Sequence, residues 1–348
     1  MKLSAIGDVV HSLPLLEVLK GNFPTARIDW LVEEEASQVI EGHPAIDRLI
    51  VSRRKQWQKR LLNLSGFPSM IREVVRFIGE VRSRDYDLVI DLQGLFKSGV
   101  LTGISKGKRK IGMSGSREGA GLFLNERPIP VDYDQHAIER YLGVAKYLEC
   151  DYIEWEGHIP VFESDMKNID MVLGPAAART RPLVAVNPIA RWDTKLWDPK
   201  RFAELADRLT SELCSEIVFT GSGQDRAIVE GISGMMEKRP LNLAGRTTLK
   251  ELAYLYSRCS ALVTTDTGPM HIAAAMGCPV VALFGPTAPW RTGPYGEMHE
   301  VIRSDIECCP CLKKSCEHMT CMKQITVECG FEAVKKILNR DRADRGQM

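Results

Sequence analysis

The residues best suited to chemistry lie in 264–271, with the sequence TTDTGPMH. Residues 261–263 are apolar and predict a buried strand, 266–268 a tight turn, and Pro269 suits the first turn of a helix. The free N–H groups at such a helix start attract phosphate. An acid, a threonine and a histidine at one strand end predict a ligand site, with an ordinary capped helix as the alternative.

Further candidate residues follow other predicted strands of the same half of the chain. The apolar run 183–187 is followed by a loop with Thr194 and Lys195, and the run 216–220 by a glycine-rich turn. Parallel strands end at one edge of a sheet, so we expect these loops to gather there. A lysine in such a loop either holds a phosphate through charge-assisted hydrogen bonds or is an ordinary surface lysine.

The start of the chain carries another candidate acid. Residues 4–8 predict a short loop that ends at Asp8, and a helix is predicted over 9–19. Asp8 can take a proton from a hydroxyl or simply cap the helix, and His11 one turn later is either a ligand contact or structural. Only three residues precede the loop, whereas a strand usually has about five. We therefore expect a very short first strand or a chain that begins late.

Two basic clusters interrupt an otherwise balanced composition, at 53–60 (RRKQWQKR) and 106–110 (KGKRK). Each is either a solvated face or a patch for an anion or a membrane surface. The net charge of +1 excludes a uniformly basic protein, and we expect no nucleic-acid partner. The sequence has no run of eighteen apolar residues to span a membrane, and no secretory signal is expected.

Half of the ten cysteines crowd into residues 308–321, the cysteine-rich tail. Cys308 and Cys311 have the spacing of metal ligands, but Cys316 and Cys321 do not complete a common zinc module. We expect reduced, packed thiols, and a bound metal is the alternative.

Strands and helices alternate along the chain, which predicts an α/β fold with mostly parallel sheets. The length of 348 residues suits two domains, and a polar, irregular stretch near the middle separates them. We expect an N-terminal domain over 1–165, a linker over 166–182 and a C-terminal domain over 183–340. Both are expected to be Rossmann-like, with their strand ends facing a cleft.

Several motifs of the sequence, taken together and in their order along the chain, resemble those of a known family. The SAIGDVVHSLP start, RRKQWQKR, YDLVIDLQGLFKS, DTKLW, DTGPMH and FGPT together resemble the ADP-heptose:lipopolysaccharide heptosyltransferases of glycosyltransferase family 9. IDWLVEE and HPAIDRLI look most like heptosyltransferase I, and the cysteine-rich tail looks more like heptosyltransferase II. The resemblance implies the two-domain GT-B architecture. It also implies inverting transfer of heptose from ADP-heptose to Kdo of the lipopolysaccharide inner core, without a metal or other cofactor.

The resemblance also implies roles for individual residues. Asp8 would be the catalytic base and Lys195 the clamp on the leaving diphosphate. The residues expected to bind the donor are Asp266, Thr267, Gly268, His271, Thr194, Gln224 and Gly285. The residues expected to bind the acceptor are His11, Arg53, Arg54, Lys55, Arg60, Gln93 and Arg109.

The expected partners are ADP-heptose, Kdo-lipid A and the anionic inner-membrane surface, which places the protein in the cytoplasm as a peripheral protein. In such proteins the last helix, here 331–339, can cross back to the first domain. Three other activities stay open: transfer to a core heptose as by heptosyltransferase II, non-catalytic binding of a nucleotide sugar, and a nucleotide-sugar epimerase or dehydrogenase. The last would want a GxGxxG turn after its first strand, which residues 4–8 lack.

Overall fold

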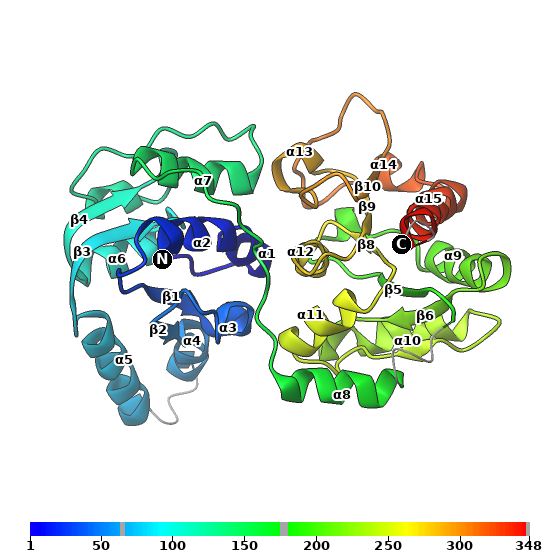
Figure 1. Cartoon of the computed structure of the whole chain (residues 1–348), viewed down its shortest axis with the longest axis horizontal. Coiled ribbons are helices and arrows are strands. Elements are labelled where there is room, and N and C mark those ends of the chain that lie inside the picture. Colours follow the sequence, from blue (N-terminus) through cyan, green and yellow to red (C-terminus); the bar gives the residue numbers. More distant parts are fainter. Residues whose placement is uncertain (63–66, 175–179, 346–348) are drawn as a thin grey trace. The chain divides into compact units, whose positions relative to one another are not determined.

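The computed structural model describes residues 1–62, 67–174 and 180–345. The chain divides into two compact units, Met1–Pro160 and Val161–Met348, called unit 1 and unit 2 from this point. Every strand pairing in both units is parallel, and helices follow the strands in the manner of Rossmann-like folds (Figure 1). The predicted α/β fold class is confirmed.

Unit 1 contains two pairs of strands. They are β1 (Asp29–Glu33) with β2 (Arg48–Ser52), and β3 (Asp85–Asp91) with β4 (Lys106–Gly112). Residues 1–3 join the two pairs through backbone hydrogen bonds. The N–H of Glu33 donates to the carbonyl of Leu3, and the N–H of Leu92 donates to that of Met1. Residues 1–3 therefore occupy the central place of the layer, where a first strand is expected.

The helices of unit 1 flank this layer and bury its apolar side chains. They are α1 (Ile6–Val10), α2 (Leu13–Asn22), α3 (Glu34–Ile40), α4 (Arg54–Leu62), α5 (Phe67–Val81), α6 (Phe96–Ile104) and α7 (Ala137–Tyr147), with a 3₁₀ turn at Ala120–Phe123. The helix predicted over 9–19 is in fact two helices. The Ser12 hydroxyl donates to the carbonyl of Val9, and the chain turns between α1 and α2 at this point.

Unit 2 is built on one parallel sheet of six strands in the order β10-β9-β8-β5-β6-β7. The strands are β5 (Leu183–Asn187), β6 (Glu216–Phe219), β7 (Leu241–Asn242), β8 (Ala261–Thr265), β9 (Val280–Phe284) and β10 (Glu300–Arg303). Every residue of β5, β8 and β9 is buried, because helices cover both faces of the sheet. This explains why these strands are continuous apolar runs in the sequence.

The helices of unit 2 are α8 (Glu163–Leu173), α9 (Pro199–Glu212), α10 (Arg226–Gly234), α11 (Leu249–Ser257), α12 (Gly268–Ala275), α13 (Pro289–Thr292), α14 (Thr320–Lys323) and α15 (Val327–Arg345), with 3₁₀ turns at Asp193–Lys195 and Gly223–Asp225. Side chains of β5, β6, β8 and β9 form one core with α9, α10 and α15. Helix α12 contacts β8 and β9 and packs against α11.

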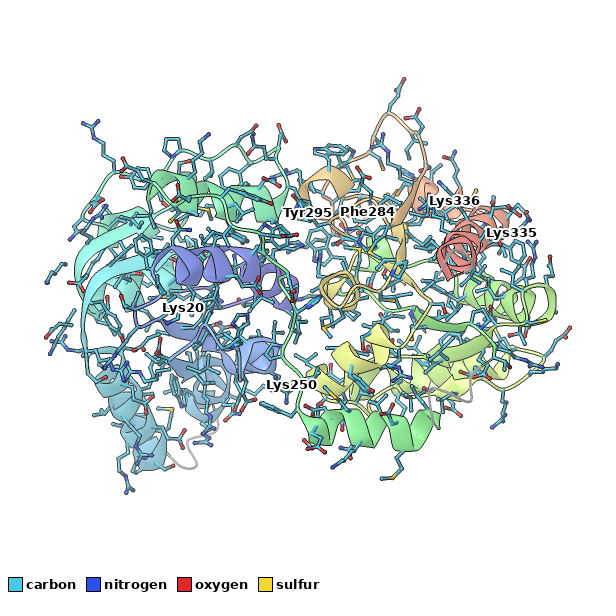
Figure 2. The ribbon with its side chains drawn as sticks, in the orientation of Figure 1. Lys20, Lys250, Phe284, Tyr295, Lys335 and Lys336 are labelled. Atoms are coloured by element: carbon cyan, nitrogen blue, oxygen red, sulfur yellow. The ribbon has the colours of Figure 1, made fainter. Side chains whose placement is uncertain are left out.

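The predicted linker at 166–182 differs from the structure. Most of α8 falls inside it, and α8 belongs to unit 2, where it packs on α11. The amide of Asn168 donates to Glu251, and Lys250 lies over the Phe162 ring with its ammonium 4.4 Å from the centroid (Figure 2). The sequence of the predicted linker is polar because much of it forms α8, a helix with one face exposed to solvent. The remainder of the predicted linker includes residues 175–179, which lie outside the described residues.

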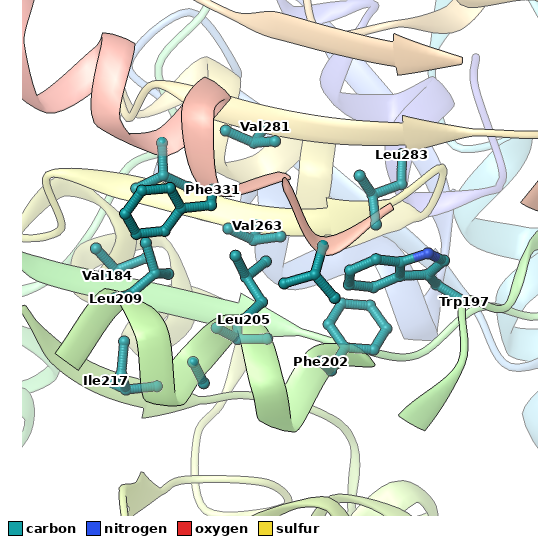
Figure 3. Packing of buried hydrophobic residues seen from close by; sticks show 14 of the residues in the cluster. Val184, Trp197, Phe202, Leu205, Leu209, Ile217, Val263, Val281, Leu283 and Phe331 are labelled. Atoms are coloured by element: carbon teal, nitrogen blue, oxygen red, sulfur yellow. The ribbon is translucent and has the colours of Figure 1, made fainter. Parts of the chain in front are cut away.

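The last helix, α15, packs within unit 2. It contacts α9 and the strands β8, β9 and β10. Phe331 enters the core beside Leu205 and Leu209 of α9 (Figure 3). On its outer side Lys336 pairs with Glu300 of β10, 2.9 Å away (Figure 2). Apolar packing and a surface ion pair therefore hold α15 to the sheet.

This packing makes unit 2 sensitive to Phe331→Ala. The ring is 3% exposed and is also covered by the guanidinium of Arg208, 4.1 Å from its centroid. Removing a buried phenyl ring costs about 3–5 kcal/mol of unfolding free energy, which urea unfolding followed by circular dichroism would measure. The control is Ile228→Ala on α10, where the side chain is 53% exposed. If both variants lost the same small amount of unfolding free energy, the packing of α15 against the core of unit 2 would be contradicted.

Candidate functional site

The order of strands in unit 2 defines where a ligand fits. The chain runs from β5 to β6 on one side of the sheet and later returns to β8 on the other side of β5. The loops after β5 and β8 therefore diverge at their carboxyl ends. Such a switch point is where parallel α/β sheets bind ligands.

An ion pair joins these two diverging loops. Lys195 ends the 3₁₀ turn after β5, and Asp266 directly follows β8. The Lys195 Nζ lies 2.6 Å from Asp266 Oδ2 and 3.4 Å from the Asp266 carbonyl oxygen. The side chains are only 14% and 8% exposed. A charged pair so well shielded from water fixes the lysine in place at the switch point.

A tryptophan and a second lysine extend this site. The Nζ of Lys195 lies 4.6 Å from the centroid of the Trp192 ring, and the Nζ of Lys314 lies 5.2 Å from the same centroid. Both distances are typical of cation–π contacts. Two lysines thus lie at one tryptophan ring, and Lys195 is the one that pairs with Asp266. Ammonium groups gathered in this way suit a diphosphate, which accepts charge-assisted hydrogen bonds.

The cysteine-rich tail brings Lys314 to this place. The Thr194 hydroxyl donates to the carbonyl of Lys313 at 2.9 Å, and the N–H of Leu312 donates to the carbonyl of Pro286 at 2.8 Å. The tail is therefore tied to the loops after β5 and β9. Sequence reasoning missed Lys314, because no local signal relates it to a tryptophan more than a hundred positions earlier.

The other predicted donor residues lie along the same edge of the sheet. Thr267 is the N-cap residue of α12, Gly268 is its first residue, and His271 is buried within it. Gln224 is exposed in the 3₁₀ turn after β6. Gly285 follows β9, and a Cβ there would lie 2.5 Å from the sulfur of Met322, so close packing requires glycine. The structure therefore gathers Lys195, Asp266, Thr267 and Gly268, with Gln224 and Gly285 on neighbouring loops.

In unit 1, Asp8 is the third residue of α1, which follows the short loop after residues 1–3. Its Oδ2 accepts a hydrogen bond from the N–H of Ala5 at 3.1 Å and lies 3.8 Å from the Nζ of Lys2. The carboxylate therefore does cap α1, as the structural alternative predicts, yet its side chain remains 41% exposed. Burial disfavours the charge of Lys2, but nearby Tyr141 and Asp8 outweigh it and raise the pKa of Lys2. A capping carboxylate beside a buried cation can still reach a substrate.

A buried carboxylate ties the strand-end loops of unit 1 together. Glu33, at the end of β1, accepts hydrogen bonds from Lys97 at 2.9 Å and from Arg54 at 3.1 Å. The same Lys97 donates to the hydroxyl of Ser4, and Gln93 Oε1 accepts from the backbone N–H of Ser4. Burial alone would raise the pKa of Glu33, but Lys97 and Arg54 outweigh it and lower that pKa. Gln93 therefore supports the loop that carries Asp8.

The remaining predicted acceptor residues already have partners. Three cations of the basic segment pair with nearby acids: Arg53 with Glu34, Lys55 with Glu35, and Arg60 with Glu73. Arg109 lies in the middle of β4, away from its carboxyl end, and pairs with Glu126. His11 is buried, with its ring edge-on to His136 at 5.1 Å. The structure does not gather these residues around Asp8 as it gathers the donor residues around Lys195.

A cavity of about 1170 Å³ in unit 1 lies elsewhere. Asp29 and Trp30 at the amino end of β1 line it, together with Tyr86 and Leu88 of β3. Neither Asp8 nor Gln93 belongs to its lining, so it is separate from the candidate base.

The tail cysteines are free thiols of differing exposure. Cys321 is buried, Cys309 packs against the same core, and Cys308 is exposed. Burial, with the thiols of Cys321 and Cys308 close by, raises the pKa of Cys309 to about 12. Across residues 1–62, 67–174 and 180–345, no three His, Cys, Asp or Glu side chains are placed to hold a metal ion.

Two parallel α/β units with charged loops at their carboxyl edges define a protein of the nucleotide-binding α/β class. A family model described as glycosyltransferase family 9 (heptosyltransferase) matches residues 74–321. Lipopolysaccharide heptosyltransferase 1 of Pseudomonas aeruginosa is 32% identical over 323 residues, 91% of this chain and 86% of that protein. The chain therefore belongs to glycosyltransferase family 9, and it is a glycosyltransferase.

Solved structures agree with this assignment. The family 9 glycosyltransferase of Veillonella parvula superimposes with a TM-score of 0.80 at 28% identity, over 97% of this chain and 96% of that one. The Escherichia coli heptosyltransferase WaaC with ADP-2-deoxy-2-fluoro heptose gives 0.73 at 26% identity, over 98% of both chains. The predicted family is confirmed, and the epimerase or dehydrogenase alternative is excluded.

The role of Glu33 predicts a pH-dependent effect of Glu33→Gln. The lowered pKa means that the ionised carboxylate stabilises the fold above its unfolded pKa near 4.3, and that this contribution is lost as the pH falls through the folded pKa. The variant should lose about 1.5–3 kcal/mol of unfolding free energy at pH 7, because hydrogen bonds to a charged group weaken. Denaturant unfolding at pH 7 and below pH 4 should show the difference shrinking on acidification.

The control for this prediction is Glu34→Gln. Glu34 pairs with Arg53, but its side chain is 36% exposed and that of Arg53 55%. An exposed pair contributes at most about 1 kcal/mol. The predicted stabilisation by the buried Glu33 contacts would be contradicted if Glu33→Gln lost no more unfolding free energy than this control. It would also be contradicted if the loss did not change with pH.

Proposed function

We propose that this protein transfers L-glycero-D-manno-heptose from ADP-heptose to Kdo of the lipopolysaccharide inner core, with inversion. The observation that carries the proposal is the shielded Lys195–Asp266 pair at the switch point of unit 2. It is supported by relatives named lipopolysaccharide heptosyltransferase 1 and by the similar structure of WaaC with an ADP-heptose analogue.

Unit 2 is proposed to hold the donor. The ammonium of Lys195, already aimed by Asp266 and Trp192, would bind the diphosphate and stabilise the charge that grows on it. The N–H groups at the start of α12, around Thr267 and Gly268, would donate to the remaining phosphate oxygens or to sugar hydroxyls. Gln224 and Gly285 are proposed to contribute from the neighbouring loops.

Unit 1 is proposed to hold the acceptor and the base. The acceptor hydroxyl oxygen attacks the anomeric carbon of heptose from the face opposite the diphosphate, which inverts that centre. As the new C–O bond forms, the bond from the anomeric carbon to the phosphate oxygen breaks, and its electron pair leaves with ADP. The hydroxyl proton passes to the carboxylate of Asp8, which is 41% exposed and so accessible. We propose that no metal takes part, so activity should persist in EDTA.

The decisive experiment is mass spectrometry of the product formed from ADP-heptose and Kdo-lipid A by the purified protein. Addition of one heptose to Kdo supports the proposal. Heptose added only to an acceptor that already carries a core heptose would assign transfer of the heptosyltransferase II type. No transfer to either acceptor, with ADP-heptose still bound, would leave only the non-catalytic function.

The acceptor carries acyl chains, so we also propose that the protein works on the cytoplasmic face of the inner membrane as a peripheral protein. No described helix is both long and apolar enough to cross a bilayer.

Lys195→Ala should weaken ADP binding about 10- to 100-fold. It removes a charge-assisted contact to phosphate and also leaves Asp266 as an unpaired negative charge beside the diphosphate. Titration calorimetry with ADP measures the change. Lys200→Ala, an exposed lysine in the first turn of α9, is the control and should bind ADP like the wild type. Unchanged ADP affinity in Lys195→Ala would remove this lysine from the donor site.

Asp8→Asn should lower kcat by roughly 10²–10⁴-fold and leave ADP affinity unchanged. Asparagine can still accept the hydrogen bond from Ala5, so the cap persists while the proton acceptor is lost. Initial rates at saturating donor and acceptor, with a thermal melt of each preparation, give the answer. Asp87→Asn, an exposed acid of the same unit paired with Lys108, is the control. If Asp8→Asn keeps more than about a tenth of wild-type kcat, Asp8 is not the catalytic base.

A further inference from the structure

Helix α5 has an apolar face wider than the core can cover. Phe77 and Val81 are buried on one side of it, where they pack with Leu3, Leu31 and Ile50 of the strand layer. The aromatic ring of Phe77 also contacts Trp57 of α4, with the ring centroids 5.3 Å apart. This side of α5 is a normal core contact.

The adjacent side of α5 carries an exposed apolar stripe. Its members are spaced four, four and three residues apart, which places them above one another on the helix surface. The stripe consists of Phe67, Ile71, Val75 and Ile78, which are 41%, 43%, 62% and 38% exposed. Singly exposed apolar residues are ordinary, but a contiguous line of four along one helix marks a contact surface.

Cations that are not paired with an acid border the stripe. Residues 53–84 contain nine lysines and arginines, of which five form ion pairs with carboxylates. Arg72 and Arg76 each follow a stripe residue, so they lie about 100° around the helix from it. Within the described part of the chain, neither they nor Lys59 of α4 is within ion-pair distance of a carboxylate, whereas Arg53, Lys55 and Arg60 are.

We propose that the α5 stripe docks on a lipid bilayer with anionic headgroups. An apolar helix face bordered by arginines is the pattern of helices that lie in a membrane interface. The apolar side chains enter the acyl boundary, while Arg72 and Arg76 extend to the headgroup phosphates. A protein partner would not require this excess of unpaired cations. The proposal places the proposed membrane association on α5, and it does not depend on heptose transfer being correct.

The experiment is sedimentation with vesicles of phosphatidylglycerol and phosphatidylethanolamine, beside vesicles of phosphatidylcholine alone. The wild type should bind the anionic vesicles, and less so as salt is raised. The double variant Ile71→Ser with Val75→Ser should bind about 10- to 100-fold more weakly, because two apolar side chains no longer enter the interface. The matched control changes Met171 and Val172 of α8 to serine, which are 81% and 43% exposed in unit 2.

Each other result counts against the proposal. Wild-type protein that does not bind anionic vesicles, or a stripe variant that binds like the wild type, overturns it. If the stripe variant instead abolishes a dimer seen by analytical ultracentrifugation while vesicle binding persists, the stripe is an interface between copies. Turnover on a soluble, deacylated Kdo acceptor should be equal in wild type and variant. Absence of turnover in both would refute the proposed function and leave the vesicle result standing.

Discussion

A carboxylate at the end of a parallel strand, shielded from water and held by a lysine from another segment of the chain, organises the polar edge of each unit. In unit 2 it is Asp266 with Lys195, and in unit 1 it is Glu33 with Lys97. A carboxylate so little exposed is costly without a partner, so the pairing fixes both loops in one arrangement. The lysine in turn reaches the next element, Trp192 in unit 2 and Ser4 in unit 1. The positions of the two lysines, and of the loops that they contact, are thus set by the need to pair each buried carboxylate with a cation.

Charge pairing also decides which cations are available to a ligand. The run at 53–60 predicts an anion-binding patch, but Arg54 is committed to Glu33, and its neighbours to Glu34 and Glu35. These acids lie about twenty positions earlier, at the end of β1, so the sequence alone does not show that they meet the cations. Lys195 is also paired, with Asp266, but Lys314 lies at the same Trp192 ring and brings a second ammonium to this site. A cluster of positive residues in a sequence is therefore a weaker guide than the balance of charge around it in the fold.

The fold was largely predictable, and the site in part. The strand predicted at 183–187 matches β5, because strands buried on both faces are uninterrupted apolar runs. The family and the enzyme class are confirmed as well. Predictions failed where tertiary contacts override local pattern: one predicted helix is two, split near Ser12, and the predicted linker contains α8. Trp192 and Lys314 meet only through folding. The catalytic and binding roles of the gathered residues stay predictions, since geometry does not reveal turnover.

The cysteine-rich tail contacts the proposed donor site, so it is informative about donor binding and not about the acceptor. Its resemblance to heptosyltransferase II suggests an acceptor of that type, yet the tail is tied to the loops after β5 and β9 through Thr194 and Pro286. Both loops belong to unit 2, the proposed site of ADP-heptose, which is the donor in either reaction. A segment that positions Lys314 beside the proposed diphosphate site carries no information about which sugar accepts the heptose. That choice is instead expected from unit 1, where Lys97 donates to Glu33 and to the Ser4 hydroxyl, and the Ser4 N–H donates to Gln93, just before the helix that carries Asp8.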